Sequence, residues 1–237
     1  MSNSNFYLSS KNSDGAIELP VLKSTAGQDV IDIAKIPETG CFTLDPGFGV
    51  TAACESKITF IDGGKGILLH RGYPIDQLAE NSDFLETCFL LINGELPSAS
   101  EKKDFISAIN EHRHIEGAAE HLFKAFPKGS HPMAMLCSSV AAMSATYNSN
   151  TDITSSEDRL ATMQRLIAKM PILAAMCHRH FTGQPFVPTN DTLSYSENFL
   201  NMMFGSPGKP SAVSPVIEKA MDRIFLLHAD HEQNAST

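Results

Sequence analysis

The clearest helix signal in the chain is the stretch Ser214-Pro-Val-Ile-Glu-Lys-Ala-Met-Asp-Arg-Ile-Phe-Leu-Leu-His228. Its opening serine and proline are typical of an N-cap followed by the first helical position. Apolar residues then recur at helical spacing, at Val216, Ile217, Ala220, Ile224 and Leu227. We therefore predict an amphipathic helix from Ser214 to about His228.

Helical patterns of this kind extend upstream as far as Pro74. The expected helices lie near 75–79 and over 83–92, 100–126, 132–147, 155–180 and 198–204. Asn81-Ser82 is a candidate N-cap for the second of them, Asn93-Gly94 is a typical helix stop, and Pro171 should kink or restart the long one. Residues 74–237 are thus expected to form one large helical domain.

The front of the chain has a different character. Residues 1–15 read as a flexible polar tail, and residues 16–73 as a small β-rich region with strands near 17–19, 30–33 and 57–61. Asp62-Gly-Gly-Lys-Gly66 lacks the spacing of a phosphate-binding loop and favours a hairpin turn. The predicted fold class is mainly α, with a multi-helical large domain preceded by a small antiparallel β region.

Charge and composition narrow the class of partner. The chain has 237 residues with 18 Lys and Arg against 27 Asp and Glu, a net charge of −9, which argues against nucleic acid and anionic membranes as partners. The longest apolar stretch noted, Met133 to Ala145, is shorter than the ~18 residues of a membrane span. The first ten residues lack the apolar core of a secretory signal, so a cytoplasmic protein with small-molecule partners is expected.

The five cysteines are odd in number and scattered, which fits neither a disulfide framework nor a zinc ribbon and favours a reducing compartment. Cys88, Cys137 and Cys177 lie in apolar stretches and are expected in the core. Residues 132–147 are rich in alanine and serine on nearly every face, as in a helix that is buried all round against a neighbouring helix or subunit.

Groups with chemical potential converge in the last ten residues, His228-Ala-Asp-His-Glu-Gln-Asn-Ala-Ser-Thr237. If the helix continues, His228 and His231 share one face. A metal site is one interpretation, although the spacing matches no zinc motif. Histidines that cap a helix end are a second, and a polar substrate site at a helix terminus is the third and favoured one.

This segment resembles the active-site segment of bacterial (type II) citrate synthases. Further stretches resemble the same family in its order: 42–48, 54–63, 66–78, 130–134 and 198–204, so that the resemblance runs from about Ala16 to Thr237. It implies a mostly helical enzyme, a dimer or a trimer of dimers, that condenses acetyl-CoA with oxaloacetate to citrate at the entry of the tricarboxylic acid cycle, with no metal or other cofactor.

The resemblance also assigns residues. It implies that His231 donates a hydrogen bond to oxaloacetate, that His228 orients it and that Asn234 is a polar neighbour. The catalytic acid and base and the arginines that grip the carboxylates are expected C-terminal to Thr237, so no catalytic residue lies within this chain, which by itself is expected to be inactive. The sequence stops within the motif, which favours an incomplete chain; the alternative is a non-catalytic helical interaction module derived from the enzyme.

Many enzymes of this type are inhibited by NADH at a separate site. Tyr147, Arg165 and Lys169 match positions that line it, and Arg165 and Lys169, at i and i+4, would offer two cations to a pyrophosphate. Glu111 stands where sensitive enzymes carry an arginine. The alternative interpretation is a solvated basic helix face.

Overall fold

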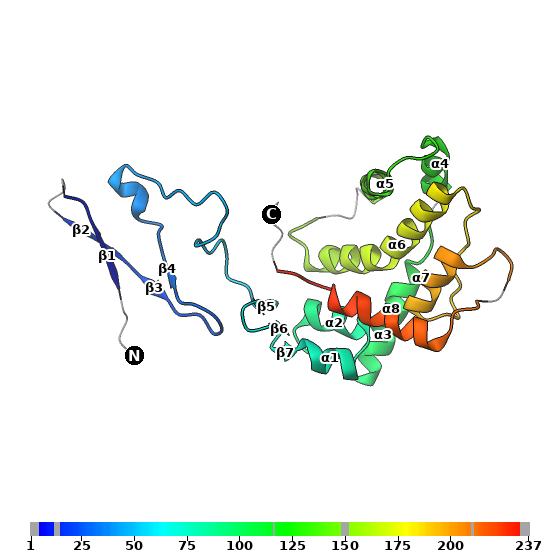
Figure 1. The fold of residues 1–237 in the computed structure, drawn as a ribbon, viewed down its shortest axis with the longest axis horizontal. Coiled ribbons are helices and arrows are strands. Elements are labelled where there is room, and N and C mark those ends of the chain that lie inside the picture. The colour runs from blue at the N-terminus through cyan, green and yellow to red at the C-terminus, as the bar shows by residue number, and fades with distance from the viewer. Residues whose placement is uncertain (1–4, 12–14, 116, 148–151, 210, 233–237) are drawn as a thin grey trace. The chain divides into compact units, whose positions relative to one another are not determined.

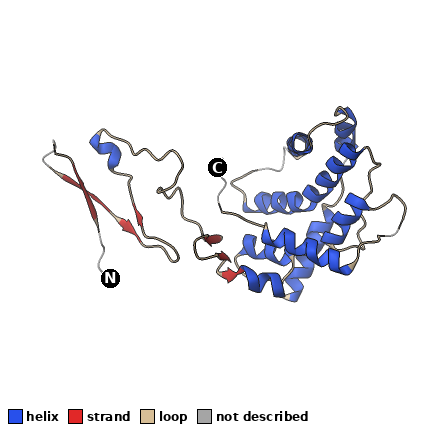
Figure 2. Ribbon diagram, viewed as in Figure 1, coloured by secondary structure: helices blue, strands red, loops and turns tan. Residues whose placement is uncertain are grey.

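The structure is a computed structural model that describes every residue except 1–4, 12–14, 116, 148–151, 210 and 233–237. The chain divides into two compact units, Met1–Ile75 with Asp230–Thr237 and Asp76–Ala229. The first contains the strands and the second contains nearly all of the helical residues (Figure 2). The predicted class, mainly α with small antiparallel sheets, is confirmed.

In its described residues, the first unit contains three small antiparallel sheets. Their strands are β1 (Phe6–Ser9), β2 (Ala16–Leu19), β3 (Val21–Leu22), β4 (Val30–Ile31), β5 (Thr59–Asp62), β6 (Ile67–His70) and β7 (Tyr73–Pro74). A 3-10 helix spans Ile36–Thr39. β1 pairs with β2, β3 with β4, and β6 lies between β5 and β7.

Local turn chemistry explains the third sheet. Asp62 pairs with Ile67 across the β5–β6 hairpin, and Gly66 takes a left-handed φ of 67° that glycine adopts without steric cost. The hairpin interpretation of Asp62 to Gly66 is therefore confirmed. The expected flexible tail over 1–15 needs correction at Phe6–Ser9, which pairs with Leu19–Ala16, because Phe6, Tyr7 and Leu8 have the propensity of a strand.

Eight α-helices lie in the described part of the chain (Figure 1). They are α1 (Ile75–Asn81), α2 (Phe84–Asn93), α3 (Ala99–Glu111), α4 (Gly117–Ala125), α5 (Pro132–Thr146), α6 (Ser156–Thr182), α7 (Tyr195–Phe204) and α8 (Pro215–Leu227). The helical range expected over 100–126 contains two helices, α3 and α4. Gly94 ends α2 at φ 96°, as Asn93-Gly94 predicts.

The N-cap of α2 differs from the prediction. Asp83, not Asn81 or Ser82, caps the helix: its side chain accepts a hydrogen bond from Glu86 N, and the Glu86 side chain accepts one from Asp83 N. This reciprocal capping box satisfies two backbone donors at once, which explains why the helix begins one residue later than the apolar pattern indicates.

The long helix α6 holds the second unit together. It packs against α3, α4, α5 and α7. One apolar cluster joins its middle and C-terminal half to α4, α5 and α7, and a second joins Ala168 to α2 and α3. Pro171 lies inside it without ending it, and Figure 1 shows the helix bent near its middle.

By length and composition α6 is also long and apolar enough to cross a membrane, which was not predicted from the sequence. Within the most apolar 18-residue window of this helix, 39 % is buried inside the protein. Its buried residues, such as Leu173, Met176 and Cys177, are members of the core cluster described above.

The predicted burial of Cys137 and the predicted burial of α5 on all faces both need revision. Cys88 and Cys177 are buried as expected, and burial raises their pKa values, to about 12 for Cys88 and about 11 for Cys177. Cys137 is exposed instead. It lies on α5, where Met135, Ser139 and Met143 face the core while the small residues of the opposite side face outward, so that within one chain this helix is buried on one face only.

Candidate functional site

The predicted substrate segment begins where α8 ends. Ser214 caps the helix by accepting a hydrogen bond from Ile217 N, and Pro215 occupies the first turn, as predicted. The last helical residue is Leu227, and His228 is the C-cap with its N–H directed at Phe225 O, 3.2 Å away. The helix therefore does not continue to His231, and the condition under which His228 and His231 would share one helix face is not met.

His228 itself behaves as a helix cap. Its Nδ1 lies 2.7 Å from Ile224 O, and since a carbonyl oxygen only accepts, Nδ1 must carry the proton. A neutral ring then leaves Nε2 as an acceptor. His228 therefore caps the helix end through Nδ1, as one of the sequence interpretations proposed. The ring is exposed, and Nε2 can accept a hydrogen bond from another group.

Beyond the helix, the chain turns sharply. Glu232 has a left-handed φ of 72°, and its N–H donates to Asp230 Oδ2 at 3.1 Å. His231 lies between them and is exposed. Asn234, the third predicted substrate residue, lies outside the described residues, as does the end of the resembling motif from Gln233 onward.

His70 belongs to the same unit as Asp230, and no sequence signal marked it as a site residue. His70 lies on β6 with no exposed surface, its Nδ1 is 3.1 Å from Thr59 Oγ1, and its Nε2 is buried without a hydrogen-bond partner among the described residues. Burial lowers the pKa of His70, and the negative charge of Asp230 partly opposes this. The hairpin β5–β6 and the segment at Asp230 are therefore close enough to interact.

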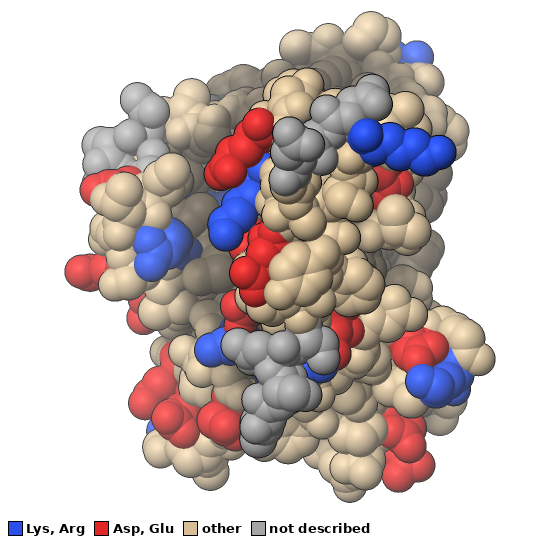
Figure 3. Space-filling model, turned by 90° about the vertical axis from the view of Figure 1, so that its left-hand side faces the viewer, with Lys and Arg blue, Asp and Glu red and all other residues tan. Residues whose placement is uncertain are grey.

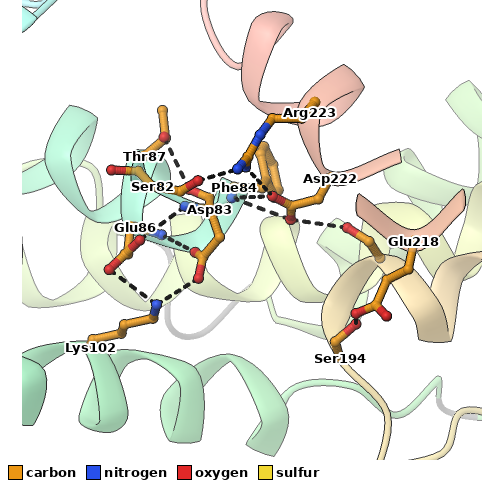
Figure 4. Close-up of polar contacts among 11 residues, drawn as sticks. Ser82, Asp83, Phe84, Glu86, Thr87, Lys102, Ser194, Glu218, Asp222 and Arg223 are labelled. Atoms are coloured by element: carbon orange, nitrogen blue, oxygen red, sulfur yellow. Dashed lines mark hydrogen bonds and ion pairs between the residues drawn. The ribbon is translucent and has the colours of Figure 1, made fainter. Parts of the chain in front are cut away.

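A polar network anchors α8 two turns before His228 (Figure 4). The Asp222 carboxylate accepts the Phe84 N–H at 3.2 Å and the Ser196 hydroxyl at 3.1 Å, so it joins α8 to α2 and α7. Arg223 Nη1 donates to Ser82 O at 2.6 Å. Burial raises the pKa of Asp222, the Phe84 hydrogen bond opposes that shift, and the nearby Asp83 charge adds to it.

The predicted NADH residues are brought together. Arg165 lies with its Cζ 4.1 Å from the centroid of the Tyr147 ring, and Lys169 Nζ is 5.7 Å from the same centroid. Lys169, however, is only 2 % exposed and its ammonium donates to His114 O. These residues therefore do not form a solvated basic helix face. Of the two cations, Arg165 is the one with a buried side-chain nitrogen, Nε, that has no hydrogen-bond partner among the described residues.

The described side chains also bear on metals and on charge. No group of three or more His, Cys, Asp or Glu side chains is placed to hold a metal ion in the described part of the chain. On the face drawn in Figure 3, acidic and basic side chains are interspersed among uncharged ones, without an extended basic area.

Comparison with known proteins places these features in a family. Residues 47–237 match the family model described as "Citrate synthase, C-terminal domain". The chain belongs to the citrate synthase family. The match covers most of the chain, including the His228 segment as far as Thr237 and the polar network around Asp222.

Solved citrate synthases have the same helical fold. The enzyme of Pyrobaculum aerophilum is 29 % identical with a TM-score of 0.69, covering 90 % of this chain and 50 % of that one. That of Thermotoga maritima is 28 % identical with a TM-score of 0.67, and that of Thermoplasma acidophilum, solved with carboxymethyl coenzyme A and oxaloacetate, is 26 % identical with a TM-score of 0.72. Each of these two matches covers 82 % of this chain and 49 % of the other chain. The chain thus spans about half the length of these citrate synthases.

Proposed function

We propose that this chain is the N-terminal portion of a type II citrate synthase, which condenses acetyl-CoA with oxaloacetate and releases citrate and CoA. The observation that carries the proposal is the family match, which extends through the His228-Ala-Asp-His231 segment. The Thermoplasma acidophilum relative was solved with oxaloacetate and a CoA derivative, which supports these two substrates.

In the proposed reaction this chain binds and orients oxaloacetate. His231, exposed beyond the end of α8, donates a hydrogen bond to the oxaloacetate carbonyl oxygen, which gains negative charge as the new carbon–carbon bond forms. His228, with its Nδ1–H held by Ile224 O, presents Nε2 as an acceptor in a fixed orientation. The acid, the base and the carboxylate-binding arginines are assigned to the part of the enzyme that follows.

The exposed face of α8 supports a larger enzyme. Val216, Ile217, Ile224 and Leu227 are between 46 % and 78 % exposed, although they form the apolar stripe of an amphipathic helix. An apolar stripe of this length normally faces a core. The relatives are about twice as long as this chain, so we assign the cover of this face to the remaining half.

The test is the His231→Gln variant in the complete enzyme. We expect kcat/KM for oxaloacetate to fall at least tenfold, equivalent to about 1.4 kcal/mol. Part of the loss should appear in kcat, because the hydrogen bond strengthens as charge develops on the oxygen. The melting temperature should stay the same, since His231 is exposed.

The matched control is His121→Gln on α4, which replaces another exposed histidine and should leave the kinetics unchanged. Normal oxaloacetate kinetics in a destabilised His231→Gln enzyme would contradict the assignment. A complete wild-type protein that contains this chain and forms no citrate would instead favour the alternative, a non-catalytic helical module.

For regulation, we propose that NADH binds at Tyr147, with Arg165 as the partner of its pyrophosphate. The expectation of two available cations is narrowed to one, because His114 O already accepts from the Lys169 ammonium. In a fluorescence titration, Arg165→Met should weaken NADH binding at least tenfold relative to wild type and to the exposed control Lys103→Met. Equal NADH affinity in all three proteins would contradict this role.

A further inference from the structure

The second unit contains a cavity of about 610 Å³ between α2, α3, α7 and α8 that the proposed function does not use. Its apolar wall is formed by Leu85, Ile106, Leu193 and the Tyr195 side chain. None of His228, Tyr147, Arg165 and Lys169 lines it. The cavity is therefore not lined by these predicted site residues, although Arg113 directly precedes His114, the partner of Lys169. It is large enough for a small organic molecule.

Arg113, which follows α3, lines this cavity and is 4 % exposed. Its Nη1 makes a single long hydrogen bond, 3.3 Å to Leu193 O, and its Cζ lies 5.8 Å from the centroid of the Tyr195 ring. It forms no ion pair with any described residue. Burial lowers the pKa of the guanidinium, and electrostatic interactions with Tyr195 and with Asp191 oppose this shift. A buried cation without a counterion is costly unless something else compensates its charge.

The other charged groups of the cavity are mostly satisfied. Asp83 and Glu86 both form ion pairs with Lys102, at 2.6 and 3.1 Å. Glu218 accepts from the Ser194 hydroxyl at 2.5 Å. The Asp222 and Arg223 contacts are those of the polar network in Figure 4. Arg113 is therefore the buried charge of this cavity that forms no ion pair within the described part of the chain.

The same lining limits the charge of a ligand. Five carboxylates and four cations border the cavity: Glu80, Asp83, Glu86, Glu218 and Asp222 against Lys102, Arg113, Lys219 and Arg223. A polyanion such as pyrophosphate would meet repulsion from this slight acidic excess. A single carboxylate matches the planar fork of one guanidinium, and the apolar wall favours a short hydrocarbon part.

We propose that this cavity binds a small carboxylate with one negative charge, and that Arg113 holds its carboxylate group. Propionate is the simplest probe. Titrated into the 237-residue chain at constant ionic strength, it should raise the melting temperature in a saturable manner, while the same concentration of chloride does not. It should also shift the Arg113 Nε–H resonance in the NMR spectrum.

Variants separate this site from a general salt effect. Arg113→Met keeps the length of the side chain without its charge and should weaken propionate binding at least tenfold, while Arg113→Lys should restore part of it. Lys128→Met, which removes a cation from a different cavity, should bind propionate like wild type. Phosphate and pyrophosphate should bind more weakly than propionate.

The proposal is overturned if propionate has no effect beyond that of chloride, or if Arg113→Met responds to it as wild type does. Tighter binding of phosphate or pyrophosphate would overturn the ligand class. If Arg113→Met does not fold, the wild-type Nε–H resonance decides: a saturable shift with propionate supports the site, and an unchanged resonance refutes it.

Discussion

At the scale of single residues, Asp222 is a carboxyl group whose pKa is changed by folding. Its pKa is raised from the ordinary 3.8, chiefly by burial, so the folded chain holds the proton more tightly than the unfolded chain. The tighter proton binding increases the free energy of unfolding, fully so at pH values below the ordinary pKa. This extra stability is lost as the pH rises through the raised pKa of the folded chain. At neutral pH the ionised carboxylate is a cost that its hydrogen bonds only partly offset.

Asp222→Asn removes this titration while keeping an oxygen that can accept from Phe84 N and the Ser196 hydroxyl. We expect the stability of wild type relative to the variant to increase as the pH falls from 7 to 4. Urea unfolding of both chains across this range measures the difference. Parallel curves would mean that Asp222 ionises as readily in the folded chain as in the unfolded one.

Asp83 allows a second comparison at this scale, because it is both the N-cap of α2 and a partner of Lys102. Asp83→Ala removes both contacts and should lower the free energy of unfolding by about 1 kcal/mol. Asp83→Asn retains a capping oxygen and should cost clearly less, since a partly exposed ion pair contributes little. Denaturant titration tests this, and equal losses in the two variants would assign the effect to the ion pair instead of the cap.

At the scale of elements, the accuracy of the sequence predictions follows the distance between interacting residues. Signals that act within a few residues, such as Ser214-Pro215, Asn93-Gly94 and the turn at Asp62–Gly66, placed helix and strand ends correctly. The end of α8 at Leu227, with His228 as C-cap, also agrees with the predicted end near His228.

Contacts between segments that are far apart in the sequence could not be predicted from local sequence patterns. Asp222 accepts from Phe84 N across 138 positions and Arg113 donates to Leu193 O across 80, and both side chains look like ordinary charged residues of a helical region. His70 was quoted within a resembling motif, yet its burial and its proximity to Asp230 follow only from strand pairing and from the return of the chain to the first unit. The family resemblance located His228 and His231 but not what holds them.

The outward face of α5 leads to a prediction at the same scale. Ala134, Ser138, Ala141, Ala142 and Ala145 are exposed small residues on one helix, and such a surface permits close approach of another backbone. We expect this face, with part of α6, to form a subunit interface in the complete enzyme. Ala142→Glu would place a charge there, and light scattering should then report single chains.

The matched control is Ser107→Glu on the exposed side of α3, which adds the same charge elsewhere and should leave the assembly intact. An Ala142→Glu enzyme with the wild-type mass would remove α5 from the interface. Loss of assembly in both variants would point to net charge, not to the position on α5.

At the scale of the whole molecule, the decisive feature is that this chain spans about half the length of the citrate synthases it matches. The proposed reaction needs a proton donor, a base and a carboxylate clamp around the substrate that His231 contacts, and positioning these groups together supplies much of the rate. We therefore expect the 237-residue chain by itself to form no citrate. The assay is the release of the CoA thiol from acetyl-CoA in the presence of oxaloacetate, with protein purified from a host that lacks its own citrate synthase and with the complete Thermotoga maritima enzyme as a positive control. A folded chain with a cooperative unfolding transition and no turnover is the expected result. Turnover above the rate without protein would show that the described helices already contain a complete catalytic set, and would overturn the assignment of the acid and base to the remaining half.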